Sequence, residues 1–164
     1  MDPPRPTPPV TACEAQDPEF ERRVHDSFGR QTFMRHLGAQ ITALQAGYCE
    51  ISLDYRDDLA QQHGFFHGGI IGTLADNASG YASYSLMPVE ATVLTVEYKL
   101  NLLAPGDGER IVSRGRVLKP GRTLIIAQSD VYALKHGRET HCATALVTLF
   151  TLAGTPDHPG MGKQ

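Results

Sequence analysis

The sequence has little of what marks several common classes of protein. It has no apolar run of about 18 residues, the length at which a membrane-spanning helix becomes a candidate. Its formal net charge of -3 gives no basic surface of the kind that nucleic-acid binding requires. Its three cysteines, Cys13, Cys49 and Cys142, are widely spaced and form no CxxC pair. These absences argue against a membrane protein, a nucleic-acid partner, a zinc site and a disulfide framework, and predict reduced thiols in the cytoplasm.

The two ends of the chain are poor in the patterns of folded elements. The first ten residues, MDPPRPTPPV, contain an acid and five prolines where a secretory signal needs an apolar segment. We therefore expect a disordered, proline-rich lead over residues 1–16 and no processing. Residues 154–164, GTPDHPGMGKQ, are expected to form a flexible tail. A single soluble domain over 17–153 remains, and the 41% hydrophobic content of the chain is sufficient for its core.

Periodicity changes along this domain from helical to alternating. Residues 18–36 have apolar side chains near helical spacing, which predicts a short leading helix that stops at Gly38. The segment AQITALQAGYCEISLDY then predicts a hairpin that turns near Ala46 and Gly47. After Pro88, turn signals recur about every dozen residues between alternating stretches. They predict four further strands, arranged as an antiparallel meander.

Residues 61–88, QQHGFFHGGIIGTLADNASGYASYSLMP, contain the one pattern of a long helix. Apolar residues recur there at steps of three and four, and many small residues keep the helix thin enough to approach another backbone closely. One acid, Asp76, interrupts the apolar face. A buried, unpaired carboxylate is costly, so Asp76 is either on an exposed stripe, paired, or used in chemistry. The elements together predict an α+β domain with a curved sheet wrapped around this helix.

The stretch HGFFHGGIIGTLADNASGYA resembles the hotdog-fold thioesterases, specifically the PaaI-like acyl-CoA thioesterases. That family has His-Gly-Gly, six further residues, and then an acid followed by a small or polar residue. The order of elements is similar over about residues 17–151. The resemblance implies a curved antiparallel six-stranded sheet around one long central helix, with a short helix before it. It also implies a homodimer or homotetramer that hydrolyses acyl-CoA.

Hydrolysis of a thioester requires a hydrogen-bond donor for the developing oxyanion and a carboxylate that activates water or attacks directly. Gly68 and Gly69 are expected to open the long helix, where unpaired backbone N–H groups and the positive end of the helix dipole are available. The alternative is that the glycines only provide a tight entry into the helix. Asp76 is the candidate base or nucleophile, and the resemblance favours this over an exposed structural acid.

Gly68 and Asp76 are eight residues apart, which separates them by about 12 Å along a helix. They cannot both touch one thioester carbonyl. We therefore expect the donor and the carboxylate of each site to come from different copies of the chain, related by a two-fold axis.

Three further polar residues are candidates for the catalytic site by their resemblance to family positions. Gln61 is where related enzymes carry Asn or Gln to orient water or the carbonyl, although a loop glutamine is often only solvated. His67 either donates to the carbonyl or braces the loop. Thr95 is where some relatives have a hydroxyl near the attacking water, although threonine is also simply a good strand residue. The combination of Gln61 with Asp76 mixes features of two branches of the fold, so direct attack and water activation both remain open.

The resemblance also implies residues that bind the substrate. The acyl group would contact apolar side chains such as Phe66 and Tyr81, although core packing is an alternative for these, and Gly69 would lie against the carbonyl. Coenzyme A would enter as part of the substrate, with no other cofactor and no metal. Its phosphates would meet basic residues on one strand and its turn, or these residues are an ordinary solvated surface. The basic residues are Arg114, Arg116, Lys119 and Arg122.

Two other functions fit the same sequence. A hotdog hydratase or dehydratase would need a catalytic histidine and an acid beside the thioester, but His67 and Asp76 do not have the spacing of that branch. A non-catalytic acyl-CoA binding module would not need Asp76. The acyl chain itself is not determined by the sequence.

Overall fold

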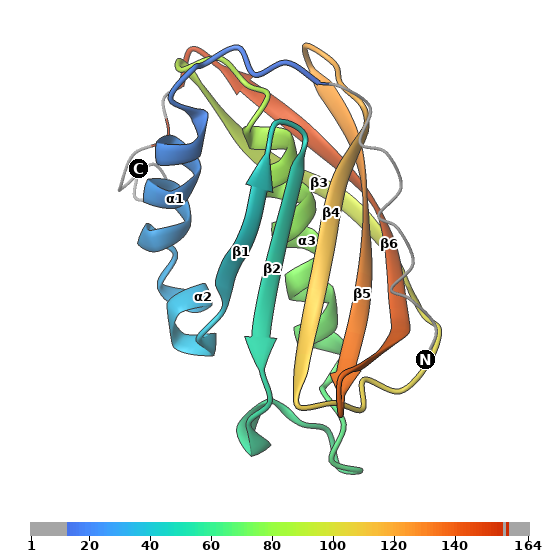
Figure 1. The fold of residues 1–164 in the computed structure, drawn as a ribbon. Helices are drawn as coiled ribbons and strands as arrows, with labels where there is room; N and C mark the ends of the chain where they lie inside the picture. The colour runs from blue at the N-terminus through green and yellow to red at the C-terminus, as the bar shows by residue number, and fades with distance from the viewer. Residues whose placement is uncertain (1–12, 156, 158–164) are drawn as a thin grey trace.

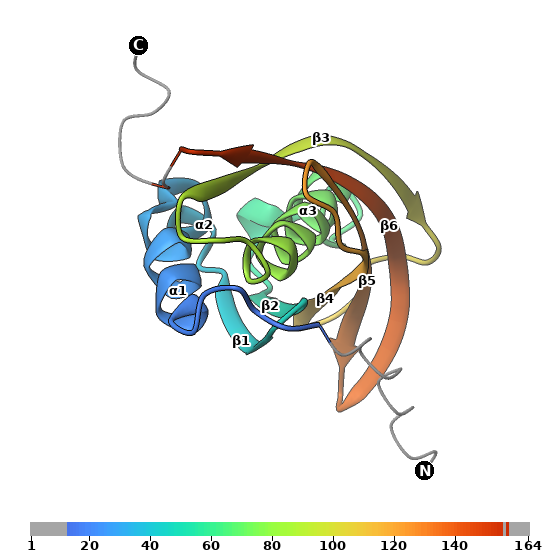
Figure 2. The same cartoon turned by 90° about the horizontal axis from the view of Figure 1, so that it is seen from above.

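The computed structural model describes residues 13–155 and 157. Six antiparallel strands form one sheet in the order β1-β2-β4-β5-β6-β3. The sheet curves around the long helix α3 (Figures 1 and 2), as the sequence predicts. The helices are α1 (Phe20–Arg30), α2 (Thr32–Leu37) and α3 (Gly68–Tyr84), with a short 3-10 turn, η1 (Asp57–Leu59). The strands are β1 (Gln40–Gln45), β2 (Tyr48–Asp54), β3 (Ala91–Leu102), β4 (Arg110–Lys119), β5 (Leu124–Lys135) and β6 (Arg138–Ala153).

The leading helix predicted over 18–36 is in fact two helices. The chain adopts an extended conformation at Gln31, with φ -70° and ψ 100°, and this residue separates α1 from α2. Gly38 ends α2 as expected, in the left-handed conformation with φ 82° that glycine adopts without strain. The break turns the chain so that Val24 of α1 and Met34 of α2 both reach the core.

Helix α3 packs so closely on the sheet that only small residues fit at the contact. A Cβ atom added to Gly115 of β4 would lie 2.3 Å from the backbone carbon of Ala78 in α3. Leu74, Ala75, Ala78 and Ala82 are fully buried on this side of the helix. The many small residues of the sequence pattern therefore let the sheet approach the helix backbone, which fixes the helix and the side chains it presents on its other face.

Of the four strands after Pro88, β4, β5 and β6 pair consecutively as the predicted meander, but β3 does not pair with β4. Strand β3 pairs with β6 at the far edge of the sheet, with Thr95 opposite Leu149, while β4 pairs with β2. Helix α3 follows β2 in the chain and crosses the concave face of the sheet before β3 begins. Strand β3 therefore lies at the edge opposite to β1. Alternation of side chains predicts that a segment is a strand, but it does not specify a partner that is distant in sequence.

Strand β3 is an edge strand with large apolar side chains exposed to solvent. Val96 is 60% exposed, Tyr98 46% and Leu102 57%. Tyr98 lies over α3, since its hydroxyl would be 3.3 Å from a Cβ added to Gly72. The alternation of apolar and polar side chains in β3 predicts that one face of the strand is buried. Within the single chain, the apolar side chains of that face are only partly covered.

The predicted lead and tail lie mostly outside the described residues, at 1–12, 156 and 158–164. Within the described part, Gln16 donates a hydrogen bond from Nε2 to the Leu86 carbonyl at 3.0 Å. Asp157 forms an ion pair with Arg30 at 2.6 Å. Of the helices in the described residues, none combines the length and the hydropathy needed to cross a membrane.

Candidate active site

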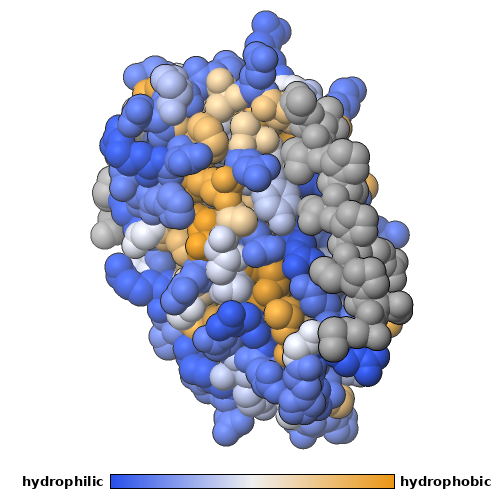
Figure 3. Space-filling model, in the orientation of Figure 1, coloured by the Kyte–Doolittle hydropathy of each residue, from blue (hydrophilic) through white to orange (hydrophobic). Residues whose placement is uncertain are grey.

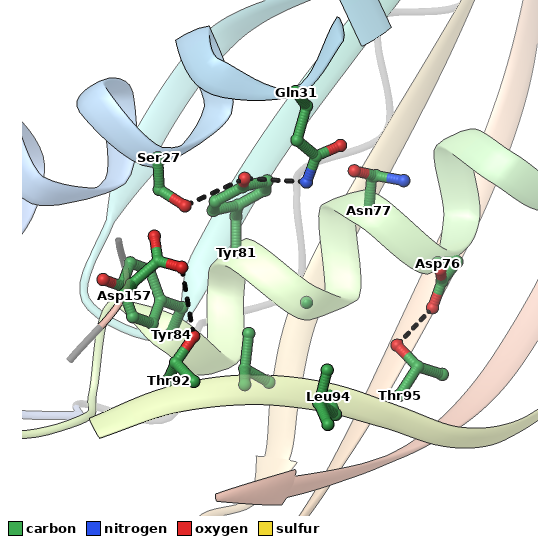
Figure 4. Close-up of a pocket in the computed structure, with 12 residues that line it drawn as sticks. Ser27, Gln31, Asp76, Asn77, Tyr81, Tyr84, Thr92, Leu94, Thr95 and Asp157 are labelled. Atoms are coloured by element: carbon green, nitrogen blue, oxygen red, sulfur yellow. Dashed lines mark hydrogen bonds between the residues drawn. The ribbon is translucent and has the colours of Figure 1, made fainter. Parts of the chain in front are cut away.

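The acid of the apolar helix lies on the face of α3 that turns toward strand β3. The Thr95 hydroxyl donates a hydrogen bond of 2.7 Å to Oδ1 of Asp76 (Figure 4). Gly115 and Ala78 hold the opposite side of the helix against the sheet. Asp76 and Thr95 are 19 residues apart in the sequence. The fold brings their side chains into direct contact at the edge of the sheet.

Two opposing effects act on the protonation of Asp76. Burial disfavours the charged carboxylate and raises its pKa, while the hydrogen bond from Thr95 lowers it. Burial is the larger effect, so the pKa of Asp76 is raised from its ordinary value. No basic side chain is among the causes of the shift. A carboxylate of this kind is a better proton acceptor than a solvated aspartate, which suits a general base.

At the start of α3, the backbone N–H groups of Gly68 and Gly69 differ in their hydrogen bonding. The Gly69 N–H donates to Nδ1 of His67 at 2.9 Å, so His67 is the N-cap of the helix. Within the described residues, the Gly68 N–H has no hydrogen-bond partner. The Gly68 N–H is therefore available to a ligand, as the predicted oxyanion donor must be, whereas Nδ1 of His67 already accepts a hydrogen bond from the helix.

A groove of about 450 Å³ opens beside Gly68. Gln61 lines it, and Oε1 of Gln61 accepts a hydrogen bond from the His63 backbone, which holds the side chain in a turn. Phe66 also lines it, although this side chain is 2% exposed and packs edge-on against Tyr55. Phe66 thus belongs to both the core and the groove wall. The remaining lining residues are mainly apolar: Phe65, Ile71, Leu102, Leu103, Ala104, Pro105 and Gly106.

Asp76 lines a different pocket, of about 400 Å³. None of its described lining residues is shared with the groove at Gly68. Within one chain the candidate donor and the candidate carboxylate therefore face separate spaces, in agreement with their separation of about 12 Å along the helix.

The Asp76 pocket contains residues that the sequence reasoning missed. Helix α1 supplies Ser27, the extended residue between α1 and α2 is Gln31, and α3 supplies Asn77 (Figure 4). Asp157 reaches the pocket from the C-terminal segment, where Thr92 donates to it at 3.3 Å. These residues come from segments distant in sequence and have no motif of their own. Only Asn77 had a signal, as the polar residue that follows the acid.

Tyr81 lies in the wall of the same pocket, with its hydroxyl in a hydrogen-bonded cluster. Gln31 Nε2 donates to it at 2.8 Å, and the Ser27 hydroxyl is 3.2 Å away. The ring is 5% exposed and packs edge-on against Phe28. Burial raises the pKa of Tyr81 to about 12, so the hydroxyl stays protonated. Tyr81 is therefore a wall of the pocket that is fixed by its neighbours.

The four basic candidates divide into two pairs. Arg114 donates to Glu50 at 2.9 Å and to Glu139 at 2.7 Å, and Arg116 donates to Asp130 at 2.8 Å. The guanidinium groups of both residues therefore already form ion pairs with carboxylates on the sheet. By contrast, Lys119 and Arg122 at the β4–β5 turn are exposed, and neither forms an ion pair within residues 13–155 and 157.

Across the described part of the chain, no three His, Cys, Asp or Glu side chains gather in a way that would hold a metal ion. The expectation of a metal-free reaction remains a prediction.

Comparison with known proteins identifies the family. The family model described as "Thioesterase superfamily" matches residues 63–140. A thioesterase family protein from Silicibacter pomeroyi, of known crystal structure, is 49% identical. The match covers 82% of this chain and 99% of that one, with a TM-score of 0.81. The chain therefore belongs to the thioesterase superfamily, and its architecture is the hotdog fold. Membership places it among the hydrolases, with thioester cleavage as the activity that the family indicates.

Two more distant structures show the same fold. A thioesterase from Haemophilus influenzae is 21% identical, covering 82% of this chain and 92% of that one, with a TM-score of 0.71. The PaaI protein from the phenylacetic acid degradation operon of E. coli is 17% identical. That match covers 84% of this chain and 96% of the E. coli chain, with a TM-score of 0.74. The resemblance to the PaaI-like branch in fold is thus confirmed.

Proposed function

We propose that the protein hydrolyses acyl-CoA thioesters at a site shared by two copies of the chain. One copy supplies Asp76 and Thr95, and the other supplies the Gly68 N–H and Gln61. The observation that carries this proposal is the separation of these groups into two pockets with no common described lining residue. Each pocket alone has one half of what thioester hydrolysis requires, a carboxylate or an oxyanion donor.

Strand β3 supports the pairing of two copies. It is an edge strand of 12 residues, and its free edge offers backbone groups that can pair with another strand. Val96, Tyr98 and Leu102 are large apolar side chains left exposed along it. Antiparallel pairing of β3 with the same strand of a second copy would cover them and place Thr95 near the interface. A homodimer is therefore the minimal active form that we propose, and two such dimers would form a homotetramer.

The site would perform the reaction with groups already in place. As water attacks the thioester carbonyl, Asp76 takes its proton, and the Gly68 N–H donates to the oxygen on which negative charge develops. Collapse of this intermediate breaks the C–S bond, and the thiolate leaves and takes a proton to become the free thiol. In direct attack, Asp76 would instead form an acyl-aspartyl anhydride that water then hydrolyses. Both routes yield the acid and coenzyme A.

Lys119 and Arg122 are the residues that we propose for the phosphates of coenzyme A. Both are cationic, exposed and free of ion pairs in the described residues, whereas Arg114 and Arg116 are engaged. Arg122→Glu should raise KM for acyl-CoA and leave hydrolysis of the matching N-acetylcysteamine thioester nearly unchanged, because such a contact contributes uniform binding. Equal loss with both substrates would instead give Arg122 a structural role.

The test of the activity is release of free thiol from a panel of acetyl-, hexanoyl-, palmitoyl-, phenylacetyl- and benzoyl-CoA. We expect hydrolysis of at least one substrate by the wild-type chain and its loss in Asp76→Asn. Binding of the whole panel without turnover would support a non-catalytic acyl-CoA binding module and contradict the proposed hydrolase.

A further inference from the structure

Large apolar side chains are exposed along β3, the edge strand that we expect a second copy to cover. They include Val96, Tyr98 and Leu102. The outer face over β1, β2 and β4 is instead mainly hydrophilic, with apolar side chains in a narrow band (Figure 3). Strand β3 also lies at the edge of the sheet (Figure 2), where its backbone groups can pair with another strand. Such a pair has to adopt one particular register along β3.

An extra residue in β3 turns two of its side chains toward α3. The pairing with β6 shifts register directly after Thr95, so Val96 forms a bulge. In a regular strand, residues three apart point to opposite faces. Here Thr95 donates to Asp76, and Tyr98 lies over Gly72, since its hydroxyl would be 3.3 Å from an added Cβ. The bulge therefore lets β3 contact α3 at two positions that are one helical turn apart.

The positions of the candidate catalytic groups on α3 locate the two-fold axis. In a shared site, Asp76 of one copy lies level with Gly68 of the other, and symmetry requires the reverse contact as well. Two antiparallel helices that meet in this way cross the axis at the residue midway between the two groups, which is Gly72. Two side chains of β3 lie over Gly72: Tyr98, and Leu100 at 3.4 Å from the added Cβ. The axis should therefore pass β3 within residues 98–100.

Charged side chains distinguish the registers within this range. Glu97 and Lys99 are exposed on the face of β3 opposite to Tyr98, and neither forms an ion pair within the described residues. Opposite side chains of an antiparallel pair share a face, so a two-fold pair sets one residue opposite itself. With Lys99 on the axis, like charges would face each other, and with Leu100 there, Lys99 would face Asn101. With Tyr98 on the axis, Glu97 faces the partner's Lys99, and this contact occurs twice.

We propose that two β3 strands pair antiparallel with Tyr98 on the two-fold axis, and that Glu97 and Lys99 of each copy form ion pairs with Lys99 and Glu97 of the other. This inference rests on the proposed function, because the shared site supplies the argument from α3. It adds the register of the pair and the residues that determine it. Glu97 and Lys99 are then positioning residues, which act on catalysis only through the alignment of the two copies.

This register aligns the two halves of each site. Because Val96 is an extra residue, Thr95 lies opposite the partner's Leu100 and next to the partner's Leu102. Leu102 lies over the start of α3, since its Cδ1 would be 3.2 Å from a Cβ added to Gly68. The pocket that Thr95 lines in one copy therefore meets the groove that Leu102 lines in the other.

Disulfide cross-linking of the full chain measures the register directly. Opposite residues of paired strands have Cα atoms about 4.5 to 5.5 Å apart, which is within the range of a disulfide. In a Cys13→Ser background, Tyr98→Cys should form a linked dimer on mild oxidation, visible in a non-reducing denaturing gel. Glu97→Cys and Lys99→Cys should each stay unlinked alone and should link to each other when mixed. Self-linking at residue 97 or 99 would displace the axis by one residue and overturn the proposed register.

Charge reversal tests the ion pairs. Glu97→Lys alone sets lysine opposite lysine twice, and Lys99→Glu sets glutamate opposite glutamate twice, so each should raise the dissociation constant of the dimer by about tenfold or more. A mixture of the two variants should form dimers as the wild type does, because the mixed pair has two contacts of opposite charge. Arg138→Glu is the matched control, since it reverses an exposed charge on β6 opposite Lys135 of β5. Light scattering measures the mass, after circular dichroism has verified that each variant is folded.

The outcomes separate this inference from the proposed hydrolase. Wild-type dimerisation of both single reversals, or no recovery on mixing them, would show that these charges do not determine the register. A dimer of Tyr98→Cys that does not link would remove the residue from the axis. A monomeric wild type would contradict both the register and the shared site. Dimers with the expected links and no hydrolysis of the acyl-CoA panel would support the register and contradict only the hydrolase.

Discussion

Thr95 on the edge strand donates a 2.7 Å hydrogen bond to Asp76 on the central helix. The contact joins the strand that we expect to pair with a second copy to the residue that we expect to perform the chemistry. Asp76 is thereby held at a fixed position, with its second oxygen available to water or substrate.

Asp76→Asn should lower kcat by about 10² to 10⁴, because the amide can neither attack the carbonyl nor accept a proton from water.

The same substitution should increase the stability of the fold at neutral pH. Burial raises the folded-state pKa of Asp76 above the ordinary 3.8, so the charged form costs stability at pH values above the unfolded pKa. That cost disappears as the pH falls below it. We expect urea denaturation to show a more stable variant at about pH 7 but not at about pH 3; greater stability of the wild type at pH 7 would contradict the burial argument.

Thr95→Val should move the acid limb of the kcat/KM profile to higher pH. The Thr95 hydrogen bond lowers the pKa of Asp76, so its loss leaves burial unopposed and raises that pKa further. Activity that depends on the charged carboxylate is then lost at a higher pH. The matched control is Thr148→Val, which removes a hydroxyl that donates to Glu97 at 3.3 Å instead. An unshifted limb in Thr95→Val would show that the titrating group is not Asp76.

Mixing two inactive variants should restore activity if the site is shared. Gly68 is the first residue of α3, a position that accepts proline, so Gly68→Pro removes the N–H while keeping the helix. In a mixed dimer with Asp76→Asn, one of the two sites regains an intact donor and carboxylate. Random exchange should recover about a quarter of wild-type activity. Gly68→Ala, which keeps the N–H, is the control and should stay active; exchange without recovery would refute the shared site.

Val96→Lys should convert the dimer to a monomer and remove activity. A lysine at position 96 would bring a charge into the apolar surface of Val96, Tyr98 and Leu102 that the pairing would cover, which opposes association. Light scattering would report the mass and thiol release the activity. Gln40→Lys places a lysine at an exposed position on β1, the other edge strand, and it controls for charge alone. An active Val96→Lys monomer would contradict the proposed assembly.

Gly115→Ala should destabilise the fold by about 3 kcal/mol or more, because overpacking against backbone cannot relax by a side-chain movement. The added Cβ would lie 2.3 Å from the Ala78 backbone. Gly29→Ala is the comparison: no atom lies within 4 Å of the added Cβ in helix α1, and alanine should stabilise by up to about 1 kcal/mol. Urea denaturation measures both, and near-equal stabilities would contradict the close approach of α3 to the sheet.

Much of the fold can be predicted from local pattern. Alternating side chains predict the strands, Gly47 and Gly38 mark two of the turns, and the small residues of 68–84 predict a helix in close contact with the sheet. The local pattern does not predict the break at Gln31, because the break depends on tertiary packing. The extended conformation of Gln31 lets Val24 and Met34 both reach the core. The position of β3 was missed because strand pairing depends on where a distant helix ends.

The candidate site also has features that the sequence predicts and features that depend on tertiary packing. Asp76 and Gly68 lie on one helix, so their separation follows directly from helical rise. The Asp76–Thr95 contact joins two elements. The sequence singled out Asp76 as an acid on an apolar helix face, whereas it indicated Thr95 only through resemblance to a family. Gln31 and Asp157 have no such resemblance, and their meeting with Asn77 in one pocket depends on the path of α1, α2 and the C-terminal segment. Tertiary packing therefore determines which polar residues line this pocket.

The edge position of β3 has a consequence for how the enzyme would respond to its own abundance. The strand that carries Thr95 is also the strand that would join two copies, so a separated chain would have two incomplete sites. Below the dissociation constant of the dimer, activity should rise with the square of the total protein concentration, and above it in simple proportion. Expression level would then act as a threshold for catalysis, without any effector molecule.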